Sequence, residues 1–186
     1  MSEDLFLKDA KEHMDKTLHV LEEELSKIST GRANPALIEG VKVDYYGTAT
    51  PLKHMAHISA PEADLIVVRP FDKSQLQAVE KAILEANLGF NPMVADEIVR
   101  IQVPKLTEER RTQLTKVVHE RGEEAKVAVR NIRRNTKDEL ETFKNEGELP
   151  EDDFHRELHA LDELTHAYCD KVDEKVAAKD KQIKTV

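Results

Sequence analysis

The feature that most constrains the fold is an apolar stripe of helical period near the N-terminus. Apolar side chains recur at intervals of seven from Leu7 to Ile28, and Leu18 and Leu25 fill the half-steps. This pattern predicts one helix of about 28 residues and roughly 40 Å. The helix is expected to end in the segment TGRANP, because Gly31 can adopt a positive φ and a proline follows. A helix with such a stripe requires other helices to cover it.

Two further long helices are predicted in the C-terminal half. The helical period returns after Thr107, a good N-cap, and no proline follows before Pro150, so one helix of about 40 residues and roughly 60 Å can form. Gly122 lies inside this helix, which costs about 1 kcal/mol relative to alanine if the position is exposed. Gly147 is expected to end the helix, and Pro150 to start the last one. Three amphipathic helices can bury their stripes only against one another, which predicts an antiparallel three-helix bundle.

The segment between the first two long helices changes period. Asp72 and Gln75 have the spacing of a capping box and begin a predicted helix that Gly89 ends. Alternating or continuous apolar runs predict strands at residues 41–46, 54–59, 65–68 and 98–103. The third of these runs is apolar throughout, which is typical of a strand buried on both faces. This segment therefore forms a small β/α/β unit.

The change of period predicts an α+β fold with two domains. The β/α/β domain, residues 30–105, is inserted into a bundle formed by residues 1–29 and 106–186. The chain passes between the two domains twice, and two short crossings side by side make a natural hinge. The residues expected to form this hinge are Thr30, Gly31, Arg32, Val103, Pro104 and Lys105.

The composition favours a slender helical protein in a reducing compartment. Charged residues reach 35% and aromatic residues only 4%, so much of the surface is exposed and the core is aliphatic. The single Cys169 excludes an intramolecular disulfide. No segment has the apolar core of a signal peptide or the ~20 apolar residues that span a bilayer. We expect a soluble, cytoplasmic protein that does not associate with membranes.

Charge is distributed unevenly along the chain. The formal net charge is −9, which taken alone argues against nucleic acid as a partner. Residues 126–134 nevertheless contain four basic residues and no acids, whereas residues 138–180 contain fifteen acids and five bases. The uneven distribution of charge therefore says more about possible partners than the net charge does.

The basic run predicts a nucleic-acid-binding face. Lys126, Arg130, Arg133 and Arg134 have the spacing i, i+4, i+7 and i+8, which places them on one side of a helix. No acid lies on that face to neutralise them, and arginine is suited to holding phosphates with two hydrogen bonds. Arg110 and Arg111, near the start of the same helix, can extend the surface.

Two other interpretations of the basic face stay open. The cations can be solvated, or they can pair with the acidic last helix. The main rival function is that of a helical adaptor or chaperone that binds another protein through that acidic helix.

Enzymatic and metal-binding functions find little support. His155 and His159 lie four residues apart, but Glu157 is misplaced for the HExxH pattern and no third ligand is near, so an ordinary helix face is favoured. There is no P-loop, GxSxG elbow or GxGxxG motif. The carboxylates occur in solvent-facing runs rather than as isolated pairs in an apolar setting, which the tuning of catalytic pKa values would require. We expect no catalysis, no cofactor and no metal.

Five segments, in this order and spacing, resemble a ribosome recycling factor. They are STGRANPAL, VDYYGTATPL, FDKSQLQAVEKAILEANLGFNP, PKLTEERR and AKVAVRNIRRN, and the resemblance covers essentially the whole chain. It implies an L-shaped molecule that acts as a monomer. Such a factor binds the post-termination ribosome across the tRNA sites of the large subunit. Together with elongation factor G and GTP, it releases mRNA and splits the subunits so that ribosomes can initiate again.

The resemblance also assigns roles to particular residues. In this family the arginines of the bundle contact large-subunit RNA, which implies this role for Arg111, Arg130 and Arg133, with Arg110 and Arg134 alongside. Three positions depart from the usual family pattern. They are Ser29 in place of arginine before TGRA, Lys105 in place of a second proline, and Asn135 in place of aspartate. The lysine removes a restriction on φ in one crossing.

Overall fold

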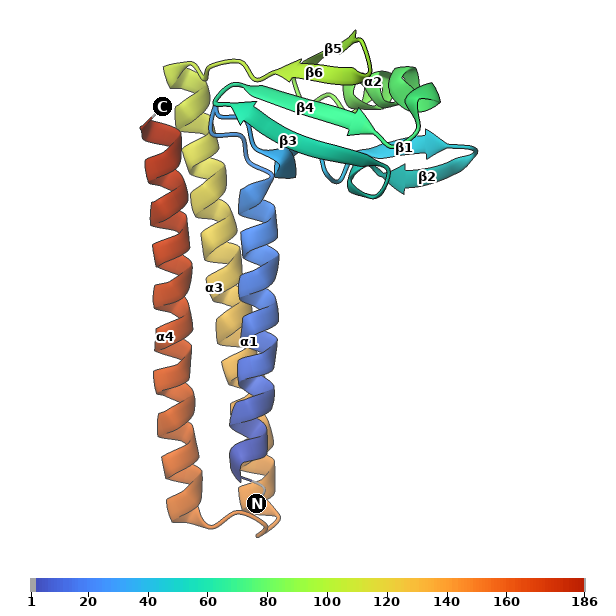
Figure 1. Ribbon diagram of the computed structural model, residues 1–186. Helices are drawn as coiled ribbons and strands as arrows, with labels where there is room; N and C mark the ends of the chain where they lie inside the picture. Colours follow the sequence, from blue (N-terminus) through green and yellow to red (C-terminus); the bar gives the residue numbers. More distant parts are fainter. Residues whose placement is uncertain (1–2, 186) are drawn as a thin grey trace. The chain divides into compact units, whose positions relative to one another are not determined.

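A computed structural model describes residues 3–185, which fold as an α+β chain (Figure 1). The long helices are α1 (Glu3–Ser26), α3 (Glu108–Asn145) and α4 (Glu151–Lys184), and the short one is α2 (Leu76–Glu85). The strands are β1 (Lys42–Tyr45), β2 (Thr48–Pro51), β3 (Ala56–Glu62), β4 (Leu65–Pro70), β5 (Asn91–Ala95) and β6 (Ile98–Gln102). The α+β fold class predicted from the sequence is confirmed.

The chain divides into two compact units. One consists of Met1–Leu25 with Leu114–Lys181, and the other of Ser26–Gln113 with Gln182–Val186. In the first unit α1, α3 and α4 lie side by side (Figure 1). Among the residues described, no helix is both long and apolar enough to cross a membrane.

Half of the apolar stripe predicted for α1 is buried, whereas Leu7 and Leu18 are half-buried and Ile28 lies beyond the end of the helix. Met14, Leu21 and Leu25 are each at most 5% exposed. One cluster brings Met14 together with Val129 of α3 and Tyr168 of α4, so all three helices contribute to the core. A second cluster lies toward the turn between α3 and α4, and its buried members are Ala10, Leu140, Leu149, Phe154 and Leu161.

The turn between α3 and α4 stops one helix and reverses the chain. Gly147 has φ +76°, and its N–H donates to the Lys144 carbonyl at 3.1 Å, while the Glu148 N–H donates to the Phe143 carbonyl at 3.0 Å. These bonds satisfy carbonyls that the end of α3 leaves free. Pro150 follows directly, and α4 begins at Glu151. The two helices are therefore antiparallel neighbours.

Gly122 occupies a close contact between α3 and α4. It is buried, and a Cβ at this position would lie 2.5 Å from the Cγ2 atom of Val176 and 3.9 Å from the Cγ1 atom of Val172. The sequence suggested a small cost for a glycine if the site were exposed. The helix contact reverses that expectation, because only a residue without a side chain allows α4 to come this near.

Tyr168 places a polar group in the bundle core. The residue is 1% exposed, and its hydroxyl donates a hydrogen bond to Asp15 of α1. Burial, and secondarily the hydrogen bond to the Asp15 carboxylate, raise the pKa of Tyr168 from 10.0 to about 12. The folded state therefore favours the protonated phenol.

We expect Tyr168→Phe to lower the free energy of unfolding by about 1 kcal/mol at neutral pH, because the hydrogen bond to Asp15 is lost. The folded pKa lies above the unfolded one, so the contribution of the phenol is complete below about pH 10 and is lost as pH rises through about 12. Urea unfolding at about pH 8 and about pH 11 tests this, and the wild type should lose more stability between them than the variant. Equal losses in the two proteins would contradict it. Tyr45→Phe, at a half-buried tyrosine of β1, is the control.

The α/β unit contains two antiparallel sheets. One pairs β1 with β2, and the other has the strand order β3-β4-β6-β5. Its core includes Val43, Ile66, Val79, Ile83 and Ile101, all fully buried, from both sheets and from α2. Asp72 caps the turn before α2 by accepting the Ser74 N–H at 2.9 Å. The capping box predicted between Asp72 and Gln75 does not form, because the side-chain amide of Gln75 donates to Ser74 Oγ at 3.3 Å instead.

Three details of this unit differ from the sequence-based expectation. Strands β2 and β5 were not predicted, because each is short and contains a proline, Pro51 or Pro92, which usually argues against a strand. The segment Leu65–Val68 was expected to be buried on both faces. Instead Ile66 and Val68 are fully buried and the alternate residues only half-buried.

Candidate nucleic-acid interface

Two arginines of the basic run on α3 have free guanidinium groups. Arg130 and Arg134 are exposed, and neither forms an ion pair with another residue of the described chain. They lie one helical turn apart on the same side of α3. An exposed guanidinium without a carboxylate partner keeps all its N–H donors available to a phosphate.

The other two cations of the run are paired with α4. Arg133 Nε donates to Asp162 Oδ1 at 2.5 Å, and Lys126 Nζ lies 2.9 Å from Asp173 Oδ1. Lys126 also contacts Glu123 Oε1 at 2.7 Å. The hydrogen bonds that Lys126 donates to Glu123 and then to Asp173 raise the pKa of Lys126, which favours its charged form.

The expectation that no acid neutralises this face is therefore wrong for Lys126 and Arg133. The interpretation that pairs the cations with the acidic last helix is correct for these two residues. The sequence contained one signal for it, because Glu123 lies at i−3 from Lys126. Asp162 and Asp173 could not be identified without the register between α3 and α4.

Cys169 of α4 packs against the core cluster of Met14, Val129 and Tyr168. Burial raises the pKa of its thiol, and the charges of Arg130 and then Lys126 act in the opposite direction. The thiol is half-buried.

Arg110 and Arg111 are not brought together with the other four cations. They lie in the first turn of α3, about four turns before Lys126. Arg110 is exposed and its Nη1 donates to Gln113 Oε1 at 3.1 Å, whereas Arg111 is half-buried and its Nη1 donates to the Lys184 carbonyl at 3.2 Å. These two arginines are a separate group.

The two segments expected to form a hinge are held by one turn between β3 and β4. The Ala33 N–H donates to the Ala63 carbonyl at 2.7 Å, and the Val103 N–H donates to the Asp64 carbonyl at 2.8 Å. Gly31 is buried with φ +80°, a conformation that favours glycine. Val103 is 2% exposed and Thr30 is half-buried, while Arg32, Pro104 and Lys105 are exposed.

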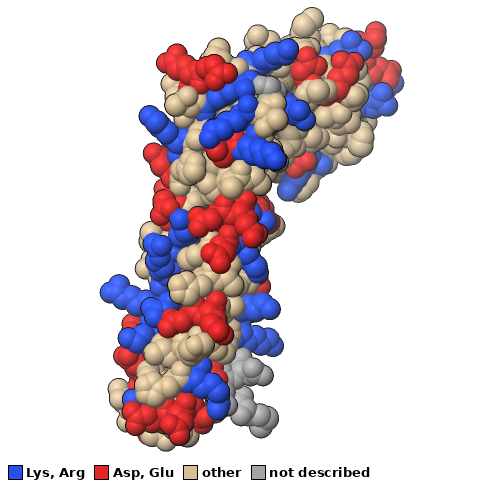
Figure 2. Space-filling view, turned by 90° about the vertical axis from the view of Figure 1, so that its left-hand side faces the viewer, with Lys and Arg blue, Asp and Glu red and all other residues tan. Residues whose placement is uncertain are grey.

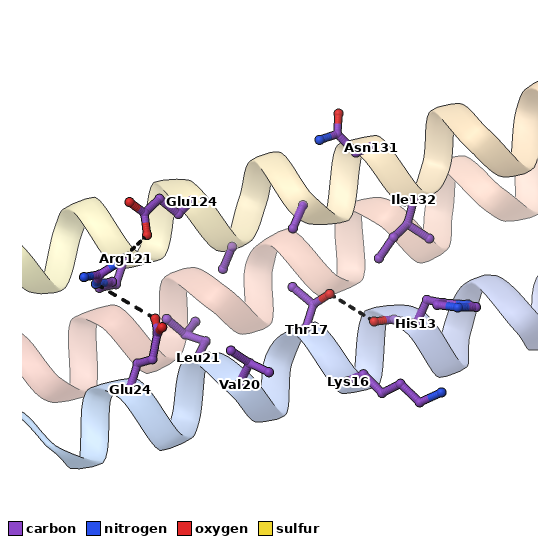
Figure 3. A pocket seen from close by; sticks show the side chains of 12 residues that line it. His13, Lys16, Thr17, Val20, Leu21, Glu24, Arg121, Glu124, Asn131 and Ile132 are labelled. Carbon is purple, nitrogen blue, oxygen red and sulfur yellow. Dashed lines mark hydrogen bonds and ion pairs between the residues drawn. The ribbon is translucent and has the colours of Figure 1, made fainter.

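A groove of about 590 Å³ runs between α1 and α3 (Figure 3). Its apolar lining includes Val20 and Leu21 of α1 and Ala128 of α3. At one end Arg121 bridges the two helices, with Nη1 2.7 Å from Glu124 Oε2 and Nε 3.9 Å from Glu24 Oε2. The residues that line the groove include no cluster of unpaired cations. The groove is therefore a weaker candidate for RNA binding than the basic face of α3.

Charges of both signs are interspersed along the visible face of the long helices (Figure 2). His155 and His159 each lie near one carboxylate, Glu151 at 3.9 Å and Glu163 at 3.8 Å. Within residues 3–185, no three side chains of the types that bind metals come together as a metal site requires.

The sequence matches one known protein family over most of its length. The profile of the family described as "Ribosome recycling factor" matches residues 21–183. A ribosome-recycling factor of Halothermothrix orenii is 46% identical over 179 residues, which are 96% of this chain and 97% of the relative. That of Halalkalibacterium halodurans is 47% identical over 180 residues, 97% of each chain.

Solved structures agree with the sequence relatives. The solution structure of a ribosome recycling factor is 38% identical and has a TM-score of 0.79, covering 100% of this chain and 99% of that one. A second similar structure, with 39% identity and a TM-score of 0.68, covers 98% of this chain and 99% of its own. It comes from models of the T. thermophilus ribosome recycling factor and the E. coli elongation factor G bound to the E. coli post-termination complex.

Proposed function

The chain belongs to the ribosome recycling factor family, and we propose that it disassembles post-termination ribosomes together with elongation factor G and GTP. It releases the mRNA and separates the subunits, so that both can enter a new round of initiation. The match over nearly the whole length of its relatives carries this proposal. The chain acts as a monomer in the cytoplasm, and the GTPase supplies the only chemical step.

The anchor to the ribosome is the basic face of α3. Arg130 and Arg134 are exposed and unpaired within residues 3–185, and arginine binds RNA phosphates with charge-assisted hydrogen bonds. Arg133 and Lys126 lie on the same side of the helix and add two further cations. The partner of this face is large-subunit rRNA. Arg110 and Arg111 make a second, separate contact at the start of α3.

The segments at 30–32 and 103–105 are the hinge of the factor. Gly31 supplies a backbone conformation that other residues rarely adopt. Lys105, unlike a proline, leaves φ free in the second crossing. A hinge of this kind lets the GTPase move the inserted domain, residues 30–105, while the helical bundle stays on the RNA.

We expect the purified protein to break polysomes down into free subunits when elongation factor G and GTP from a matched bacterium are present. Sedimentation after one round of termination measures the fraction of ribosomes split. Omission of GTP and omission of elongation factor G are the controls, and each should abolish the effect. No splitting above the level of elongation factor G alone would contradict the proposed function.

A further inference from the structure

Half of the basic face is occupied by carboxylates of the same chain. Arg133 and Lys126 are bound to Asp162 and Asp173 of α4, while Arg130 and Arg134 have no ion-pair partner within residues 3–185. The four cations therefore differ in their readiness to bind an anion, although they lie within nine consecutive residues of one helix.

A carboxylate uses the same donors of arginine and lysine as a phosphate does. Both anions accept charge-assisted N–H hydrogen bonds, and the guanidinium fork fits either of them. Arg133 Nε, at 2.5 Å from Asp162 Oδ1, cannot donate the same hydrogen to an RNA phosphate while this pair persists. Binding of an RNA phosphate through this N–H of Arg133, or through the hydrogens that Lys126 gives to Glu123 and Asp173, therefore requires an exchange of anions.

We propose that Asp162 and Asp173 are internal competitors of RNA, which hold Arg133 and Lys126 in the free protein and release them to RNA phosphates on binding. This inference rests on the RNA-binding function proposed above. The competition lowers the affinity for the ribosome below what four free cations would give. A factor that must leave the ribosome after each round benefits from that limit.

The solvent exposure of the two ion pairs makes the exchange feasible. It also predicts which cation leaves its carboxylate more readily. The Arg133 and Asp162 side chains are 37% and 41% exposed, so water reaches this pair and the net stabilisation from it is small. The Lys126 side chain is only 16% exposed and has two carboxylates, Glu123 and Asp173. Arg133 should therefore be released before Lys126.

With the pairing of α3 and α4 known, the sequence of α4 accounts for the lack of a carboxylate partner at Arg130 within residues 3–185. Asp162, His166, Cys169 and Asp173 follow one another at steps of four, three and four residues and so share one side of the helix. The two carboxylates stand at the ends of this row. The residues between them on the row carry no carboxylate, and Cys169 is the group that Arg130 influences. Arg130 is left free for the first contact with RNA.

The test compares aspartate-to-asparagine variants that remove the same charge. Dissociation constants for purified large ribosomal subunits are measured at one fixed salt concentration. Asp162→Asn should bind about fivefold more tightly than the wild type, since a surface ion pair of modest strength no longer competes. Asp173→Asn should gain only about twofold, because Glu123 still holds Lys126.

Asp170→Asn is the matched control for net charge. Asp170 lies on α4 beside Cys169, is exposed, and forms no ion pair with the described residues. Its substitution should change the affinity less than Asp162→Asn does. Equal gains in the two variants would show a general charge effect and would overturn the proposal. A weaker affinity of Asp162→Asn would also overturn it, because the carboxylate would then orient Arg133 for binding.

A double-mutant cycle tests whether the gain of affinity in Asp162→Asn arises from the Arg133–Asp162 pair. In an Arg133→Ala background, Asp162→Asn should gain no more than the Asp170→Asn control, because no cation is left to release. A full fivefold gain in that background would contradict the competition. Loss of binding in Arg130→Ala with no effect of Asp162→Asn would refute this inference alone. Unchanged binding in Arg130→Ala would refute the RNA anchor itself.

Discussion

Replacing Arg130 and Arg134 together by alanine should lower the affinity for the large ribosomal subunit about 100-fold. Each exposed guanidinium is expected to make charge-assisted hydrogen bonds to a phosphate, and such bonds are the strongest polar contacts available to this face. Neither side chain is paired with a described residue in the free protein, so no internal contact is regained when it is removed. The same variant should lose most of its activity in polysome breakdown.

Fold stability and net charge provide the controls for this variant. The double variant should unfold at nearly the wild-type temperature, because exposed cations contribute little to stability. Lys8→Ala with Lys11→Ala removes two exposed cations from α1 and changes the net charge equally. This control should bind nearly as the wild type does. A comparable loss of affinity in both double variants would mean that total charge, rather than the face on α3, determines binding.

Gly122→Ala should destabilise the protein by about 1–2 kcal/mol, although alanine is the better helix former. Propensity alone would favour the substitution by about 1 kcal/mol at an exposed position. At the buried contact the new Cβ would lie 2.5 Å from Val176 Cγ2. Val176 is β-branched and has one strongly preferred rotamer in a helix, so the clash is relieved only by moving α4. Overpacking of this kind costs about 1–3 kcal/mol.

Chemical denaturation tests the close contact between α3 and α4. The proteins compared are the wild type, Gly122→Ala, Val176→Ala and the double variant. Val176→Ala alone should also destabilise, because it removes buried methyl groups. In the double variant the Cβ added by Gly122→Ala would fill part of the space that Val176→Ala vacates, so the combined effect should be less than the sum of the separate ones. Strict additivity, or a gain of stability in Gly122→Ala, would contradict the packing seen in the structure.

The elements that follow from local chemistry were predictable from the sequence. The period of seven in α1 sets which residues are buried, and Met14 and Leu21 are in the core as expected. Gly147 and Pro150 mark the turn between α3 and α4 because each restricts the backbone in a specific way. Strand β6 was also found, since its alternation is regular.

Contacts that depend on how α3 and α4 are aligned could not be predicted from the sequence. From the sequence, Gly122 is expected to destabilise its helix, and its role becomes clear only when Val176 is placed opposite it. Asp162 and Asp173 are two of many carboxylates in α4, and nothing in their spacing says which cations they meet. The basic run lies on a long helix as predicted, but its division into free and paired members required the antiparallel packing of the two helices.

The dependence of ribosome binding on salt tests the RNA anchor most directly. If the four cations of this face replace counterions on RNA phosphates, they should contribute roughly −3 to the slope of a plot of log K against log salt concentration. Arg130→Ala with Arg134→Ala should make the slope shallower by roughly 1.5, since two phosphate contacts are lost. The Lys8→Ala with Lys11→Ala control should retain the wild-type slope. An equal slope in the wild type and the arginine variant would show that these arginines do not contact phosphates.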